Sequence, residues 1–396
     1  MHRSSFTGGV ALLLTLAATA HADGPGVGTP TVVSVGDSAI SGEAGRWAGN
    51  TNNDYTLVDA LGSTAYYDNG SSEAIVGCHR SKASEIGIGG GIASKNLACS
   101  GARTYTQPYD PDNDFKPGLD FYDDGAGHIG QAKALQSYAA THNVKMVVAL
   151  ISANDYGFAD IVEQCVVDWY YSPSWWRDYC NDDSSITAKF TSSNIAAITT
   201  ATKNAYLNLR TAMRNAGYAD TQWTLVAQTY SSPIPNGAGN RYPETGYTRQ
   251  TTGGCGMWNR DADWANNTVV PTLNNTVRNA ASQSGIAGVK ILDAQNALVG
   301  RRLCENTVGL LEEKGVANWQ SAGAVDKTEW VSQIRTTSTF SGPYELQEDA
   351  HPSYWGQKAL RNCVRQAYNA GTVRGGTCTR SANGLNANGE PNMTLQ

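Results

Sequence analysis

Val32-Val33-Ser34-Val35-Gly36-Asp37-Ser38 is a short apolar run that leads directly into a turn sequence. Valine favours buried strands, whereas Gly, Asp and Ser are common where a strand ends in a turn. The stretch therefore predicts a buried strand that stops at Gly36. Two interpretations of Ser38 follow: an ordinary turn residue, or a nucleophile held at the tip of the strand.

Three later apolar runs also have the length of buried strands, at residues 144–151, 223–227 and 289–292. Amphipathic helical patterns occupy residues 129–139, 195–216 and 355–367. Apolar strands that alternate with amphipathic helices indicate a parallel sheet covered on both faces. Such a fold places its ligand site at the carboxyl ends of the strands, where Ser38 and Asn154 are expected.

The start of the chain has the features of a secretory signal peptide, residues 1–22. A basic residue precedes a short apolar run, and Ala20-His21-Ala22 provides a cleavage site. The run is too short to span a membrane, and no later segment is long enough. We therefore expect a secreted, extracellular protein without an integral membrane segment.

The composition excludes some classes of partner. The 396 residues carry a formal net charge of −6 and contain no basic run, which argues against nucleic acid or an anionic membrane as the main partner. No repeat or linker divides the chain, although its length would allow two domains. Residues 372–396 are polar and are expected to form a C-terminal surface tail. We expect a monomer.

An even number of cysteines in an exported chain predicts disulfides. The eight are Cys78, Cys99, Cys165, Cys180, Cys255, Cys304, Cys363 and Cys378. Sequential pairing is the simplest of many possibilities. Zinc is the alternative, but no C-x-x-C or Cys/His cluster has ligand spacing. Asp110, Asp112 and Asp114 alternate like calcium ligands, but Phe115 stands where a calcium loop needs Gly, so we expect no metal and no cofactor.

A serine nucleophile needs a base, and four histidines follow the leader: His79, His128, His142 and His351. His351 is distinctive because it follows a carboxylate-rich segment and precedes the last amphipathic helix. The G-x-S-x-G and H-E-x-x-H motifs are absent, which makes the α/β-hydrolase arrangement and the common zinc proteases poor interpretations.

Four short blocks in chain order resemble those of the GDSL/SGNH hydrolase family. The blocks are Gly36-Asp37-Ser38, Cys99-Ser100-Gly101-Ala102, Ser152-Ala153-Asn154-Asp155 and Glu348-Asp349-Ala350-His351-Pro352. Cys78-His79-Arg80-Ser81 adds a resemblance to the secreted, disulfide-containing bacterial esterases and lipases. The resemblance implies one three-layer α/β/α domain of flavodoxin-like type, residues 23–371, that hydrolyses carboxylic esters.

The resemblance also implies roles for individual residues. Ser38 would be the nucleophile and His351 the base, and the N–H groups of Ser38 and Gly101 with the Asn154 amide would form the oxyanion hole. Acyl transfer needs such donors because negative charge develops on the former carbonyl oxygen.

The last two blocks depart from the family pattern in two places. Ser152 stands where the family usually has Gly, and Glu348 stands where it often has Asp. We expect Glu348 to orient His351. Asp349 and a main-chain carbonyl remain alternatives for that role.

An aromatic segment at residues 168–179 lies between Cys165 and Cys180. Trp175 and Trp176 are candidate substrate-binding residues on a flap over the site, and the alternative is local core packing. Lipid acyl esters and carbohydrate acyl esters are both open as substrates. A rival function is a secreted, non-catalytic carbohydrate-binding protein that uses residues 168–179. A glycosidase with paired carboxylates is a further alternative, but no pair of acids stands out.

Overall fold

A computed structural model of the protein describes residues 23–109 and 114–396. The predicted signal peptide, 1–22, lies outside the described residues, as do Asp110 and Asp112 of the alternating aspartates.

The described residues form a seven-stranded sheet with the order β2-β1-β3-β4-β5-β6-β7. The strands are β1 (Pro30–Gly36), β2 (Ala93–Asn96), β3 (Asn143–Leu150), β4 (Thr224–Gln228), β5 (Lys290–Asp293), β6 (Gly376–Leu385) and β7 (Pro391–Leu395). All neighbours from β2 to β6 pair in parallel, and β7 is antiparallel to β6. The chain passes from β1 to β2 on one side of β1 and then to β3 on its other side. This change of direction defines the switch point where α/β sheets of this type bind ligands.

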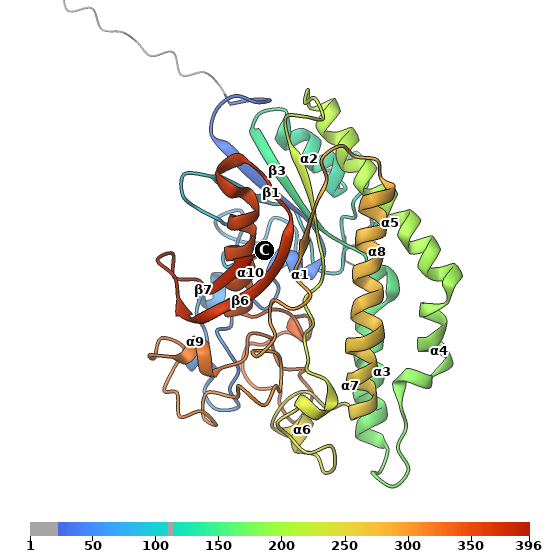
Figure 1. The fold of residues 1–396 in the computed structure, drawn as a ribbon, viewed down its shortest axis with the longest axis vertical. Helices are drawn as coiled ribbons and strands as arrows, with labels where there is room; N and C mark the ends of the chain where they lie inside the picture. Colours follow the sequence, from blue (N-terminus) through green and yellow to red (C-terminus); the bar gives the residue numbers. More distant parts are fainter. Residues whose placement is uncertain (1–22, 110–113) are drawn as a thin grey trace, which may run out of the picture.

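Helices cover both faces of the sheet and complete a three-layer α/β/α fold (Figure 1). α2 (Gln131–Ala139), α5 (Ser192–Asn215) and α8 (Val270–Gln283) pack together on one side, and α10 (Tyr354–Tyr368) lies on the other beside β6 and β7 (Figure 1). α3 (Phe158–Tyr171) follows the third sequence block.

The remaining elements are short. The short helices are α1 (Ser38–Ser41), α4 (Ser184–Thr187), α6 (Thr248–Thr251), α7 (Asn259–Trp264) and α9 (Ala324–Lys327). Single turns are η1 (Tyr55–Leu57), η2 (Gly62–Thr64), η3 (Ala153–Tyr156), η4 (Cys180–Asp182), η5 (Ala188–Phe190), η6 (Gly237–Gly239), η7 (Ala265–Val269), η8 (Leu346–Glu348) and η9 (Asn369–Gly371).

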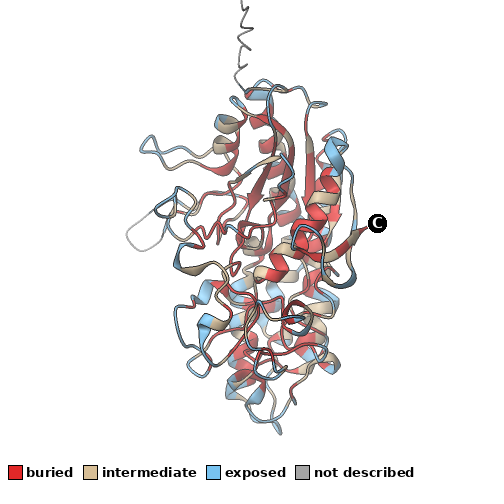
Figure 2. Ribbon diagram, turned by 90° about the vertical axis from the view of Figure 1, so that its left-hand side faces the viewer, coloured by how far each residue is buried: buried red, intermediate tan, exposed pale blue. Residues whose placement is uncertain are grey.

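The predicted strands and helices are confirmed, because β1, β3, β4, β5, α2, α5 and α10 coincide with the apolar and amphipathic patterns. The core follows the central strands, where Val32, Val33 and Val35 are fully buried. Figure 2 shows this buried centre between more exposed outer surfaces. The sequence patterns did not predict α3, α8 and β2. β2 reads Ala-Ser-Lys-Asn at a sheet edge, where a strand does not need an apolar sequence.

The predicted surface tail, 372–396, is wrong. These residues form β6 and β7 at the edge of the sheet, and Cys378, Met393 and Leu395 are buried. Burial alternates along β7, which is the period expected of a strand with one covered face. The alternation spans only five residues, too few to stand out within a polar segment.

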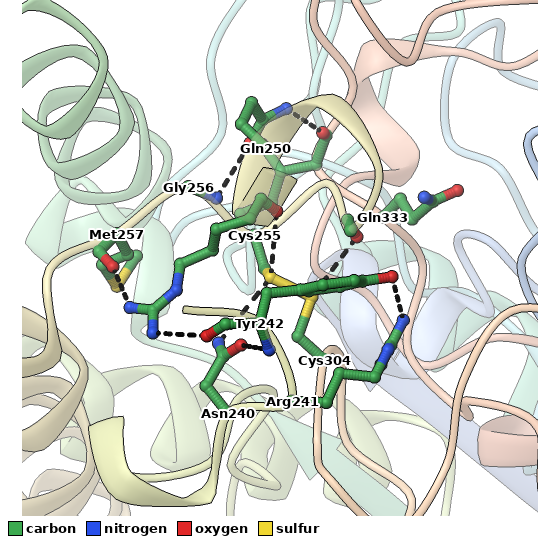
Figure 3. The surroundings of a disulfide bond; sticks show 12 residues. Asn240, Arg241, Tyr242, Gln250, Cys255, Gly256, Met257, Cys304 and Gln333 are labelled. Carbon is green, nitrogen blue, oxygen red and sulfur yellow. Dashed lines mark hydrogen bonds between the residues drawn. A yellow bond between two sulfur atoms is a disulfide. The ribbon is translucent and has the colours of Figure 1, made fainter. Parts of the chain in front are cut away.

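The eight cysteines form four disulfides with sequential pairing: Cys78–Cys99, Cys165–Cys180, Cys255–Cys304 and Cys363–Cys378. Figure 3 shows the third of these, which joins two long irregular segments. Beside it, Gln250 accepts from the Gly256 N–H and donates to the carbonyl of Ile334. The crosslink therefore supports a segment that lines the cavity described below.

Across the two described ranges, the structure contains no helix with both the length and the apolar character needed to cross a membrane.

Candidate active site

Ser38 lies at the carboxyl end of β1 and opens α1. The turn before it requires glycine, because Gly36 has φ +137° and a Cβ there would lie 1.9 Å from the carbonyl oxygen of Leu150 in β3. Asp37 caps α1 by accepting from the Ala39 N–H at 3.2 Å. The close packing of β1 on β3 therefore sets the position of the serine.

His351 reaches this serine from 313 positions along the chain. Its Nε2 lies 2.6 Å from the Ser38 Oγ, and its Nδ1 lies 2.9 Å from the main-chain oxygen of Asp349. A carbonyl oxygen only accepts hydrogen bonds, so we assign the ring proton to Nδ1. Nε2 is then free to accept from the serine hydroxyl, as a general base must.

The prediction that Glu348 orients His351 is wrong. The Glu348 carboxylate accepts instead from the Trp47 Nε1 at 2.7 Å, from the Tyr66 hydroxyl at 2.5 Å and from the Glu345 N–H at 3.0 Å. These bonds hold it in a buried position away from the imidazole. Of the three alternatives for the role, the structure places the main-chain carbonyl against the ring.

The carboxyl group of Asp349 also points elsewhere. Its Oδ2 accepts from the Arg335 N–H at 2.8 Å, and Ala350 has a left-handed φ of +60°. This turn leaves the carbonyl of Asp349, rather than its side chain, beside the imidazole. Burial raises the pKa of Asp349 to about 8.

Three predicted donors lie around the same cavity as Ser38 and His351. Within the described residues, the N–H groups of Ser38 and Gly101 donate to no protein oxygen. The Asn154 amide donates one N–H to the carbonyl of Ala102 at 2.9 Å, which fixes its orientation and leaves the second N–H free. The arrangement can therefore meet a negatively charged oxygen with up to three uncharged donors.

Tyr230 connects the blocks, although no sequence motif predicted this role. Its hydroxyl donates to Asp37 and accepts from the Ala153 N–H at 3.0 Å, so it joins the serine turn to the asparagine turn. Burial raises the pKa of Asp37 to about 7, and the bond from Tyr230 opposes that rise. Its position two residues beyond β4 is a signal that could have identified it, because the carboxyl ends of these strands share one edge.

Two further side chains brace the turns. Gln131 at the start of α2 accepts from the Gly36 N–H at 2.7 Å and donates to the Gly36 carbonyl at 2.8 Å. Asp155 accepts from both the N–H and the hydroxyl of Thr104, which ties the Gly101 segment to Asn154. No sequence pattern predicts these hydrogen bonds, because the two residues that form each bond lie far apart in the chain.

The cavity has a volume of about 670 Å³ and a largely apolar wall. The wall comes from α3, α8 and the segments that follow β5, through Phe158, Val162, Val166, Val270, Leu273, Leu298, Ile334 and Leu346. Charged side chains, Glu43 and Lys116, also line it. The cavity is suited to an apolar group attached to a more polar one.

The structure does not bring Trp175 and Trp176 to this cavity. Their exposures are 81% and 74%, so they belong neither to a flap closed over the site nor to local core. The first part of the aromatic segment is the end of α3, where Trp169 is buried. The predicted substrate-binding role of the two tryptophans therefore lacks a contact with the site.

No family model and no curated protein matches the chain. Similar solved structures include an extracellular lipase from Streptomyces rimosus, with 16% identity, 85% of this chain and 99% of that chain covered, and a TM-score of 0.43. A phospholipase A1 from Streptomyces albidoflavus has 17% identity, coverage of 86% and 99%, and a TM-score of 0.45. A carbohydrate acetylesterase from Sinorhizobium meliloti has 11% identity, coverage of 86% and 99%, and a TM-score of 0.35. Lipases and esterases are the enzymes that the four sequence blocks resemble.

Proposed function

We propose that the protein is a serine hydrolase of carboxylic esters, of the GDSL/SGNH type, with Ser38 as nucleophile and His351 as base. The observation that carries the proposal is the 2.6 Å contact between the Ser38 Oγ and the His351 Nε2 inside a cavity that Gly101 and Asn154 also line. A serine hydroxyl is a weak nucleophile until a base accepts its proton, and this contact provides the base.

The reaction proceeds in two acyl transfers. As the Ser38 Oγ bonds to the ester carbon, its proton moves to the His351 Nε2, and the carbonyl oxygen becomes an oxyanion that the three N–H donors stabilise. The imidazolium then returns the proton to the departing alkoxide, which leaves as an alcohol. Water then attacks the acyl carbon as it passes a proton to the same Nε2, and the imidazolium returns this proton to the Ser38 Oγ as the carboxylic acid leaves.

The main-chain carbonyl of Asp349 has a specific part in these steps. It holds the Nδ1–H and stabilises the imidazolium through its dipole, without the full charge of a carboxylate. The protein thereby orients the tautomer with a group that does not titrate.

The apolar wall of the cavity supports a substrate with an apolar acyl group, such as a lipid acyl ester. An acetyl ester of a carbohydrate would leave most of that wall uncovered. The burial of apolar acyl surface contributes roughly 25 cal/mol per Å². Longer acyl groups should therefore bind more tightly until the cavity is filled.

Hydrolysis of p-nitrophenyl esters of graded acyl length, acetate to palmitate, tests the proposal. We expect kcat/KM to rise with chain length to an optimum, Ser38→Ala to abolish turnover, and Asn154→Ala to lower kcat by about 10²–10³-fold. Ser100→Ala is the matched control, because this neighbouring serine lacks a base, and it should retain activity. Unchanged activity in Ser38→Ala would refute the nucleophile.

A second candidate is a non-catalytic carbohydrate-binding protein, and the exposure of Trp175 and Trp176 favours it. The binding function would be supported if the protein hydrolysed none of the esters and bound a polysaccharide, and if Trp175→Ala abolished that binding.

We also propose that the protein is exported and that its single domain extends to the end of the sheet. The four disulfides and the leader sequence support export. The pairing of β6 with β5 supports a domain of residues 23–396 in place of 23–371.

A further inference from the structure

A second histidine, His79, lies buried between two carboxylates. Its Nδ1 lies 2.6 Å from the Glu43 Oε1 and its Nε2 lies 3.1 Å from the Glu345 Oε2. The His79 side chain is 4% exposed and that of Glu43 is fully buried, whereas Glu345 is about half exposed. The ring of Tyr66 stacks on the imidazole with centroids 4.7 Å apart.

The contacts of His79 define its charge. An ionised carboxylate only accepts hydrogen bonds, so both ring nitrogens must donate, and the ring is an imidazolium. Burial alone would lower the pKa of His79, but the hydrogen bonds to Glu345 and Glu43 outweigh it and raise the pKa to about 10. His79 is therefore a fixed cation at neutral pH and cannot serve as a second base.

The partners of this cation belong to the segments that carry the reacting groups. Glu43 follows α1, and its N–H donates to the Ser38 carbonyl at 3.2 Å. Glu345 begins the turn that leads to His351, and its N–H donates to Glu348. Each carboxylate is thus anchored a few residues from the nucleophile or from the base.

The backbone next to His79 extends the network to the second block, Cys99-Ser100-Gly101-Ala102. The preceding residue, Cys78, is joined to Cys99 and accepts from the Ser100 N–H at 3.1 Å, directly before Gly101. The Ser41 hydroxyl in α1 donates to the His79 carbonyl at 3.3 Å. His79 and the preceding Cys78 together therefore contact the segments of the nucleophile, the oxyanion donor and the base.

We propose that His79 is a positioning residue, whose imidazolium bridges Glu43 and Glu345 and thereby holds Ser38 and His351 at reacting distance. The proposal rests on the proposed function. It assigns His79 no contact with substrate, so its loss should lower kcat and leave KM, which depends on the apolar wall, nearly unchanged.

Neutral variants of the bridge and one matched control test the proposal. His79→Gln removes the cation. Glu345→Gln removes the negative charge that links this cation to the base segment, at a half-exposed position. Glu73→Gln is the control. Glu73 lies 3.7 Å from the His79 Nε2, the nitrogen that also faces Glu345, but it belongs to none of the segments of the nucleophile, the oxyanion donor and the base. It removes the same charge without breaking the bridge.

We expect kcat to fall roughly 10- to 100-fold in His79→Gln and several-fold in Glu345→Gln, because small misplacements of reacting groups have large effects on rate. The double variant should be no slower than His79→Gln alone, since both changes break one bridge. Hydrogen exchange in residues 345–351 should become faster in both single variants. Glu73→Gln should behave as the wild type in both measurements.

Several outcomes would overturn the assignment. Equal kcat in the wild type, His79→Gln and Glu345→Gln would do so, as would an equal loss of kcat in Glu73→Gln, which would indicate a general charge effect. A fall in kcat with unchanged exchange in residues 345–351 would also contradict it. In each of these cases the wild type still hydrolyses esters, whereas a wild type that hydrolyses none refutes the proposed function itself.

Discussion

Ser152 has a backbone conformation that suits glycine, with φ +128° and ψ −18°. Its hydroxyl is buried and has no hydrogen-bond partner among the described residues. The residue follows β3 and lies two positions before Asn154, at the block position where the resembled family usually has Gly. A side chain here is strained, and the strain is maintained by the surrounding packing.

Relief of this strain should stabilise the protein. Ser152→Gly is expected to raise the free energy of unfolding by about 1 kcal/mol, because the strain lost exceeds the entropy that glycine adds to the unfolded chain. Ser152→Ala removes only the unpaired hydroxyl and should be less stable than Ser152→Gly. Urea denaturation of the three proteins measures the difference, and an Ala variant more stable than the Gly variant would contradict the explanation.

Asp349 allows a test of which group orients His351. Asp349→Asn should retain kcat/KM within about three-fold at pH 7, because the main-chain oxygen still accepts from Nδ1 and the new amide oxygen can still accept from Arg335. The raised pKa, about 8, already leaves the native carboxyl largely uncharged at that pH. A loss of a hundred-fold or more would instead assign the carboxylate to the role. Steady-state kinetics on a p-nitrophenyl ester distinguish the two results.

At the scale of elements, β6 and β7 close one edge of the sheet. The Cys363–Cys378 disulfide joins β6 to α10, and Gln366 of α10 donates to the Met393 carbonyl of β7 at 3.0 Å. The C-terminal residues are therefore part of the core.

Two neighbouring substitutions in β7 test this description. Leu395→Ala should lower the free energy of unfolding by about 2–3 kcal/mol, as expected for a buried leucine. Thr394→Ala, on the less buried face, should change it by about 0.5 kcal/mol or less. Chemical denaturation measures both, and two neutral variants would restore the interpretation of residues 372–396 as a tail.

The segment after α3 provides a different prediction. Because Trp175 and Trp176 are exposed and lie away from the cavity, their joint replacement by Ala should leave kcat/KM for short soluble esters within about two-fold of the wild type. Phe158→Ala, within the cavity wall, should change the preferred acyl length. A changed preference for acyl chain length in the double tryptophan variant would instead indicate that this segment contacts the substrate.

At the scale of the whole molecule, several buried groups bind protons more tightly in the folded state. Burial raises the pKa of Asp37 and Asp261 to about 7 and of Glu85 to about 8. A carboxyl with a raised pKa contributes stability that is complete below its unfolded pKa, near 4, and is lost as the pH rises through the folded value. The unfolded state then releases protons more easily, so these groups make the free energy of unfolding fall as the pH rises from about 4 to 8.

A substitution at Glu85 tests one contribution to this fall of the free energy of unfolding with pH. Its carboxyl group is fully buried, and neither oxygen meets a hydrogen-bond donor with good geometry among the described residues. Glu85→Gln should match the wild type near pH 5 and exceed its stability at pH 8, by on the order of 1–3 kcal/mol. The exposed Glu163→Gln is the control and should follow the wild type. Parallel curves for Glu85→Gln and the wild type across this range would contradict the assignment.

Much of the fold could be predicted because it depends on local patterns. Valine runs and helical periodicity located four strands and three helices, and the spacing of the cysteines made sequential pairing the simplest choice. The four blocks also named the residues that meet at the cavity. α8 was not predicted because Asn, Thr, Arg and Ser make up much of its length. α3 was not predicted because its aromatic end resembled a loop.

The site's connections could not be predicted in the same way. Glu348 has the spacing of a histidine partner. In the folded protein it accepts hydrogen bonds instead from Trp47 and Tyr66, which lie about 300 and 280 positions away in the chain. Tyr230 and His79 gain their roles only through residues that folding brings beside them.

Residue type and order along the chain were sufficient for the four strands β1, β3, β4 and β5, for the presence of disulfides, and for the choice of Ser38 and His351 as candidate reacting groups. The three-dimensional arrangement decided which acceptor faces His351, how Glu348 and His79 are used, and that the last residues close the sheet. The reason is physical: backbone periodicity and turn preferences act over a few residues, whereas buried hydrogen bonds and charges depend on every group that packing brings within reach.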